Sequence, residues 1–158
     1  IWASQLRVDH PLMIAESFRL DLFPDTNPAL LAAIIAAFVN ERQVDDTPVT
    51  VRSSPKKLHS AFYHIRNRLT PFTKHMNRQG FTPSTLYLAP AATMYKWASG
   101  YPFEIVAEEA GIEEGDLANL IFRTADNLRH IATLAAFFPE AAQSARKAVD
   151  LIMKEPLI

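Results

Sequence analysis

Hydrophobic side chains recur at helical spacing through most of the chain. After Asn27 and Pro28, apolar residues return every three or four positions, a pattern typical of a helix with one side in the core. Asn is a favourable N-cap and Pro is favourable in the first helical turn, so we expect a helix from Pro28 to near Gln43. Comparable patterns predict helices over residues 11–23, from 55 towards 76, over 89–99, from about 102 to 110, over 113–137, and from 139 to before 156.

Prolines and glycines mark where these helices begin and end. Gly100 and Gly111 each follow an apolar periodic segment, where glycine can take the left-handed conformation that stops a helix. Pro71 is expected to kink or split the helix that begins after Pro55. Residues 48–52 alternate briefly like a strand, but one short strand would lack a partner.

These signals predict an all-α fold, a single helical bundle of about six to eight helices over residues 1–158, with a long central helix near 113–137. One side of that helix is apolar and is expected to face the core; it carries Leu117, Leu120, Ile121, Leu128, Ile131, Ala132 and Ala135. Another side is polar and carries Asn119, Arg123, Asn127 and His130, at i, i+4, i+8 and i+11.

Length and composition favour one soluble domain. A chain of 158 residues with 49% hydrophobic content can bury about 70% of the surface that it exposes when unfolded. The absence of cysteine excludes disulfides, thiolate zinc sites and cysteine nucleophiles, and suits a reducing cytoplasm. No apolar run approaches the roughly 18 to 20 residues that cross a bilayer, so no membrane partner is expected. Because Ile1 is neither an initiator Met nor part of a signal pattern, we expect a piece of a longer protein.

The net charge of −1 conceals a segregation of charge along the chain. Residues 1–46 carry three basic and seven acidic side chains, and residues 104–158 carry five and ten. The middle, 47–103, has eight basic side chains and no Asp or Glu. Two interpretations stand side by side: the acidic flanks fold over this basic middle, or it faces nucleic acid.

Catalytic patterns are not found. The four glycines are too widely spread to form a phosphate-binding loop. His59, His64 and His75 have no carboxylate near them in sequence, so we interpret them as solvated or capping side chains rather than metal ligands. Four acids flank a predicted helix junction, where solvation or a favourable position near a helix N-terminus explains them better than paired-acid hydrolysis: Glu108, Glu109, Glu113 and Glu114.

The spacing of Ala107, Gly111 and Leu117 is that of a helix-turn-helix. A small residue lets two helices approach, glycine makes the turn, and the later apolar residue packs back on the first helix. The second helix would begin with Glu113, Glu114 and Asp116, which phosphates repel. We therefore interpret this segment as a structural corner rather than a DNA-reading motif.

Two short motifs carry a family resemblance. They are W-A-S-G-Y-P-F at residues 97–103 and E-G-D-L at 114–117, followed by charged and apolar positions up to Ile131. Their sequence and separation resemble the DSHCT domain, the C-terminal helical module of superkiller-like and exosome-associated DExH-box helicases. The resemblance is strongest over 88–157, extends to 11–43, and is weak over 47–86.

The resemblance implies a C-terminal accessory domain without a catalytic site of its own. Its expected partners are the helicase motor domains of the same polypeptide and single-stranded nucleic acid, RNA rather than DNA. ATP and Mg would bind in that motor, and no cofactor or metal is expected in this chain. In the family, the helix that follows the E-G-D element lines the path of the threaded strand, which implies that 113–137 does so here.

This chain departs from the family at two positions of that helix. Asn119 stands where Arg is common, and Phe122 where a basic residue is frequent, so grip on phosphates is expected to be weaker or relocated. Asn119 can still bond a base or sugar; Phe122 either stacks on a base or packs in the core, the second being favoured. The candidate nucleic-acid contacts are Asn119, Arg123, Asn127, Arg129 and His130, together with Lys96, Arg66 and Arg68 from the basic middle.

Trp97 and Phe103 are expected to fill a seam between helices, because they flank a helix-ending glycine. Two alternatives of other classes remain for the chain as a whole. One is a helix-turn-helix regulator that binds duplex DNA of defined sequence. The other is a non-catalytic scaffold whose basic surface docks on an acidic protein.

Overall fold

All secondary structure in the described part of the chain is α-helical. The computed structural model describes residues 11–24, 27–40, 54–80 and 86–158, and the all-α prediction is confirmed there. The predicted alternation at 48–52 lies outside the described residues. Seven helices are described: α1 (Pro11–Arg19), α2 (Pro28–Val39), α4 (Lys56–Arg78), α5 (Leu88–Ala98), α6 (Phe103–Ala110), α7 (Glu114–Ala132) and α8 (Pro139–Ile152).

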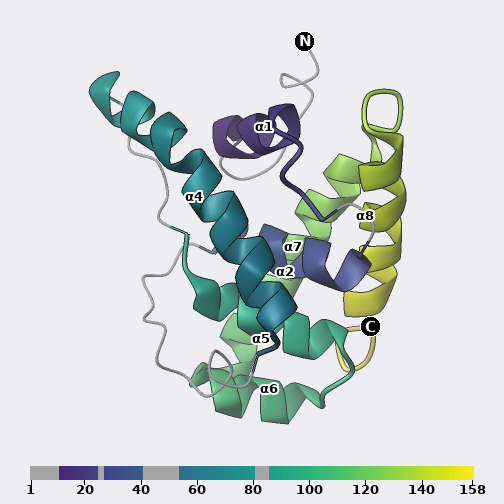
Figure 1. Cartoon of the computed structure of the whole chain (residues 1–158). Helices are drawn as coiled ribbons and strands as arrows, with labels where there is room; N and C mark the ends of the chain where they lie inside the picture. The colour runs from purple at the N-terminus through teal and green to yellow at the C-terminus, as the bar shows by residue number, and fades with distance from the viewer. Residues whose placement is uncertain (1–10, 25–26, 41–53, 81–85) are drawn as a thin grey trace.

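The bundle is built around α2. Every residue from Leu30 to Val39 is buried, and the helix packs against α4, α5, α7 and α8 (Figure 1). Its pattern predicted one core-facing side, but a helix that is hydrophobic all round is covered on all sides. The predicted start is confirmed, since the Asn27 side chain accepts a hydrogen bond of 3.2 Å from the Leu30 amide. The helix ends at Val39 rather than near Gln43, because Asn40 has an extended backbone.

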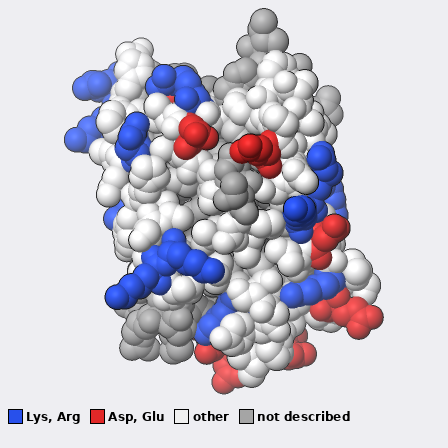
Figure 2. Space-filling model, turned by 45° about the vertical axis from the view of Figure 1, so that its right-hand side comes forward, with Lys and Arg blue, Asp and Glu red and all other residues white. Residues whose placement is uncertain are grey.

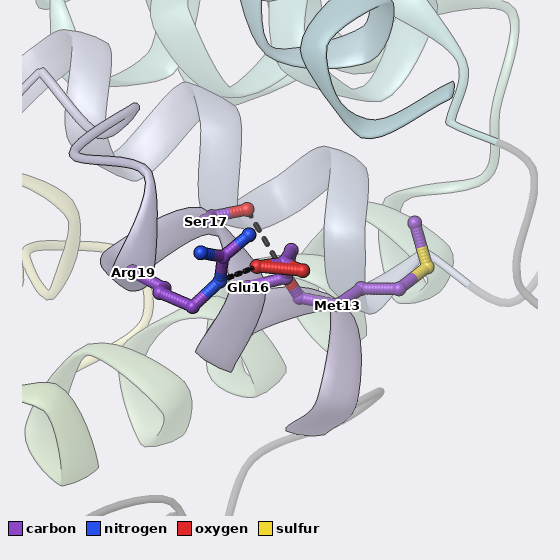
Figure 3. A network of polar contacts seen from close by, with 4 residues as sticks. All are labelled: Met13, Glu16, Ser17 and Arg19. Carbon is purple, nitrogen blue, oxygen red and sulfur yellow. Dashed lines mark hydrogen bonds and ion pairs between the residues drawn. The ribbon is translucent and has the colours of Figure 1, made fainter. Parts of the chain in front are cut away.

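A cluster of aromatic rings joins α1 to the start of α8. The ring of Phe18 lies 4.8 Å from that of Phe23 and 4.5 Å from that of Phe138, measured between centroids. Ser17 is fully buried beside them, and its hydroxyl donates a 2.9 Å hydrogen bond to the Met13 carbonyl, which satisfies it within the helix (Figure 3). Figure 3 also shows the ion pair between Arg19 and Glu16 on the outside of α1.

Helix α4 runs through Pro71 without interruption. Pro71 was predicted to kink or split this segment, but Lys56–Arg78 is one helix of 23 residues. Proline cannot donate to the carbonyl four residues earlier. Next to this gap, the Thr70 and Thr73 hydroxyls bond the carbonyls of Arg66 and Leu69 at 3.1 and 3.3 Å.

The corner between α6 and α7 has the form that its spacing predicts. Gly111 ends α6 in the left-handed conformation with φ 68°, and the Ile112 amide bonds the Ala107 carbonyl at 3.1 Å. Ala107 and Leu117 are both buried. Glu113 and Glu114 are exposed at the start of α7, where they suit the helix dipole and would repel phosphates.

Trp97 connects α5 to the end of α8, and its predicted structural role is confirmed. Its side chain is 2% exposed, meets Phe103 edge to face, and donates from Nε1 to the Ile152 carbonyl at 2.9 Å. Lys154 closes the same junction, because its Nζ lies 4.5 Å from the Trp97 ring centroid and donates to the Trp97 carbonyl at 2.9 Å. Burial lowers the pKa of Lys154, so the ring and the carbonyl offset a desolvation cost.

Helix α7 is shorter than predicted. The pattern indicated a helix from 113 to 137, but α7 ends at Ala132. The Thr133 amide and hydroxyl both bond the His130 carbonyl, at 3.1 and 2.6 Å, and the Leu134 amide reaches back three residues to Ile131. These tighter bonds end the α-helix and leave Leu134 buried, whereas Ala135, predicted to face the core, is exposed.

Glycine-to-alanine substitutions on the two sides of this corner should have opposite effects. Gly111→Ala forces a Cβ into positive φ and should lower the free energy of unfolding by about 1–2 kcal/mol. Gly115→Ala, within α7, should raise it by roughly 0.5–1 kcal/mol. An added Cβ meets no described atom within 4 Å at either position, which leaves backbone conformation as the difference. Chemical denaturation measures both, and equal effects would contradict the assignment of Gly111 as a left-handed helix stop.

The Trp97 junction should be sensitive to loss of one hydrogen bond. Trp97→Phe keeps an aromatic ring but removes the donor to the Ile152 carbonyl, and is expected to destabilise the domain by about 1–3 kcal/mol. An unchanged denaturation midpoint would show that the indole N–H contributes nothing to the α5–α8 junction.

Candidate nucleic-acid interface

A groove lies between the C-terminal end of α2 and the outward side of α7. Its volume is about 390 Å³. Two residues come from α2 and its cap, and the rest come from the first four turns of α7. The lining residues are Val39, Asn40, Asp116, Asn119, Leu120, Phe122, Arg123 and Asp126.

The groove presents an exposed aromatic ring and an exposed amide. Phe122 is 40% exposed, so the favoured expectation that it packs in the core is wrong. Its neighbour Ile121 takes the core position instead and is fully buried. Asn119 is exposed one turn before Phe122, and Arg123 is half-buried on the side nearer the core. Three of the side chains singled out for this helix thus share one hollow.

Charges within the groove nearly cancel. Arg123 is accompanied by two carboxylates, Asp116 and Asp126. Arg129, a further predicted contact, is exposed and bonds Asp126 at 3.0 Å. Neither acid was among the predicted contacts, although their spacing from Asn119 places them on the same side of a helix. Asn40 was not among them either, and no spacing within α7 can indicate it because it comes from another helix.

Asn127 does not lie on this outward face. It is 4% exposed, and its side-chain amide donates to the Arg123 carbonyl at 2.8 Å. The reason is helical geometry: each step of four residues turns by about 400°, so a row of such steps drifts by about 40° at a time. Two steps after Asn119 the row has entered the buried side of α7. The burial of Asn127 argues against a contact with a bound strand, whereas His130 returns to a half-buried position.

Lys96 is also withdrawn from solvent. It is 8% exposed, its Nζ donates to Glu109 at 2.8 Å, and it lies 5.1 Å from the centroid of the Tyr101 ring. Glu109 belongs to the acidic C-terminal segment, so here an acidic flank does fold over the basic middle. Lys96 therefore joins α5 to α6 and is not placed to contact a ligand.

Arg66 and Arg68 lie on α4, away from the groove. Both are exposed, and they point to different sides of that helix because they are two residues apart. Arg66 lies over the rings of Tyr63 and Phe62, at 4.6 and 5.6 Å from their centroids. Neither has an ion pair with any described carboxylate. The basic middle thus divides into a covered part at Lys96 and an uncovered part on α4.

The described residues offer no cluster typical of metal binding. No three His, Asp or Glu side chains gather within the described ranges. His59 bonds the Ser54 hydroxyl at 2.6 Å, while His64 and His75 are exposed on the surface of α4. None of the described helices combines the length and the apolar character that a membrane span needs.

Comparisons with known proteins agree with the motifs in α5 and α7. A family model, the DSHCT (NUC185) domain, matches residues 1–158. The chain is also similar to the DExH-box ATP-dependent RNA helicase DExH15, chloroplastic, of Arabidopsis thaliana, with 26% identity over 159 residues. That match covers 98% of this chain and 14% of the relative, so the chain corresponds to a small part of that protein. Because the family model matches its whole length, this chain belongs to the DSHCT domain family.

Proposed function

We propose that this chain is the C-terminal accessory domain of an ATP-dependent DExH-type helicase and guides a single strand, RNA rather than DNA, along α7. The strand separation would be driven by motor domains of the same polypeptide, on which this domain packs and in which ATP and Mg bind. The family and the printed name of the relative support this assignment. The observation that carries the strand contact is the groove with Phe122 at its rim.

The groove is suited to a base or sugar rather than to a phosphate. Two carboxylates beside a single arginine leave little net attraction for an anion. The same carboxylates, with the amides of Asn40 and Asn119, can accept from and donate to the edge of a base or to a 2′-hydroxyl. An exposed ring such as Phe122 offers a face on which any base can stack. The volume of the groove falls within the roughly 300–1,000 Å³ of small-molecule pockets.

A groove without excess positive charge also suits a strand that must move. Stacking of one base contributes about 1–3 kcal/mol. Each charge-assisted hydrogen bond to a phosphate contributes about 1.5–3 kcal/mol, so a phosphate held by several cations is released less easily than a stacked base. Arg123 lines the same groove, so under this proposal it contacts a phosphate next to the bound base. Arg129, paired with Asp126, would have to leave its partner to do the same.

The test uses the full-length protein that carries this chain. Phe122→Ala should weaken single-strand binding by about 5- to 100-fold, because one stacking contact is lost, and should lower strand-stimulated ATPase activity and unwinding. Asn119→Ala should act in the same direction with a smaller effect. Binding is measured by fluorescence anisotropy with single-stranded RNA and DNA of the same sequence, at one fixed salt concentration.

Phe137→Ala is the matched control. Phe137 is 45% exposed, close to the exposure of Phe122, but lies in the turn before α8 and lines a different hollow. It should leave strand binding and ATPase activity unchanged. Equal losses for the two phenylalanine variants, or no loss for Phe122→Ala, would contradict a role of the groove in strand guidance.

A further inference from the structure

Helix α4 carries a band of positive charge and has no Asp or Glu of its own. Residues 54–80 contain six Lys or Arg side chains and three His, and no Asp or Glu. All six cations are exposed, and none has an ion pair with a carboxylate of the described residues. They are Lys56, Lys57, Arg66, Arg68, Lys74 and Arg78. In Figure 2, blue atoms gather at the upper left, the side on which α4 ends in Figure 1, while blue and red lie close together at the lower right.

Arg78 suits the dipole at the end of α4, but other parts of this charge are unfavourable for the helix. Lys56 and Lys57 occupy the first turn, where the helix dipole favours acids, and α4 has no acid there. Lys74 and Arg78 are four residues apart, a spacing at which like charges repel. Each feature costs a few tenths of a kcal/mol or more, so a polyanion that binds here would relieve repulsion already present.

Two cations and two histidines form a straight row along one side of α4. Lys57, His64, Arg68 and His75 follow one another at steps of seven, four and seven residues, which keeps them on one side of the helix over about 27 Å. Lys74 and Arg78 lie beside the end of this row. Beyond Leu69 no residue of α4 is buried, and the last turns extend past α1 in Figure 1. A ligand can therefore approach this end of the helix from several directions.

The surface of α4 lacks what a protein partner or a base would need. The large apolar side chains exposed within the described ranges are Tyr101, Ile105, Phe122, Phe137, Leu151 and Ile158, and none of them belongs to α4. Protein interfaces take most of their energy from buried aromatic and apolar anchors. Single-strand base recognition likewise uses exposed rings. The rings next to these cations, such as Tyr63 under Arg66 and Tyr95 under Lys57, are at least half-buried, and a row of cations without an exposed ring is the pattern of a contact to phosphates alone.

We propose that α4 binds the phosphodiester backbone of nucleic acid, without reading its bases, through Lys57, Arg68, Lys74 and Arg78. This site is separate from the groove on α7 and does not depend on the function proposed for that groove. With this site, the protein binds phosphates through α4, a helix that does not line the groove. Such contacts are independent of sequence and steeply weakened by salt.

The test measures binding of the chain to a labelled single strand of about 16 nucleotides and to a duplex of about 16 base pairs, both longer than the roughly 35 Å of α4. Salt is varied between about 50 and 200 mM, the range where counterion release is resolved. Lys74→Gln with Arg78→Gln removes two phosphate contacts but keeps good helix formers. We expect about tenfold weaker binding at 50 mM salt. The slope of log affinity against log salt should fall by about 1.4 for the single strand or 1.8 for the duplex. The two probes identify which form of nucleic acid α4 prefers.

Arg146→Gln with Lys147→Gln is the matched control. These two cations are also exposed, but they lie on α8. Their replacement lowers the net charge of the chain by two, as the α4 double substitution does. They should change affinity and slope by much less. Equal losses for the two pairs would mean that net charge alone matters and would overturn the α4 site. Failure of the wild-type chain to bind either probe at 50 mM salt would also overturn the α4 site for nucleic acid. An acidic protein would then be the remaining ligand for the cations of α4.

Variants in the groove separate this proposal from the proposed function. Phe122→Ala should leave the salt slope of the chain unchanged, because it removes no phosphate contact. The groove can thus fail its test in the full-length protein while α4 passes, and the reverse also holds. Circular dichroism of every variant verifies that α4 and the bundle remain folded.

Discussion

The complete burial of α2 is the constraint on which the rest of the fold depends. A helix whose residues from Leu30 to Val39 are all covered needs neighbours on every side, and α4, α5, α7 and α8 supply them. Three of those neighbours, α4, α7 and α8, are amphipathic, with one side in the core and one side exposed, whereas α5 is buried along nearly its whole length. The outward side of α7 and the charged side of α4 are available to ligands because their apolar sides are used in this way. The groove forms where α2 ends against α7.

The molecule divides its charges between two kinds of surface. In the body of the bundle, cations lie next to acids, as in the Lys96–Glu109 pair between α5 and α6 and the Arg129–Asp126 pair on α7. On α4, six exposed cations have no such partner among the described residues. A groove with nearly balanced charge and an exposed ring suits bases, whereas an unbalanced row of cations suits phosphates. The two surfaces together would hold a strand by chemically different contacts.

The candidate contacts show how far spacing along a helix can be trusted. Asn119 and Arg123 were predicted to share a face and do line one groove. The same four-residue spacing also predicted Asn127 on this face, but Asn127 is buried. A row of residues at four-residue steps turns slowly round the helix axis, so its later members lie on another side. Lys96 was predicted as a contact but is buried for another reason. Its Nζ bonds Glu109, which is thirteen positions away and on a different helix. Local periodicity contains neither piece of information.

The sequence by itself determined the helices, most of their ends, the corner at Gly111 and the family, because caps, glycines, prolines and apolar periods act within a few residues. It also determined that the basic middle has no acid of its own. Only the tertiary structure decided which of those cations are covered, that Phe122 is exposed while Ile121 is buried, and that Asn40 joins α7 in one groove. It also decided where α7 ends, since Leu134 is buried through the turn that follows Ala132. These outcomes depend on which surfaces meet when the helices pack around α2, and contacts between distant segments leave no periodic trace in the chain.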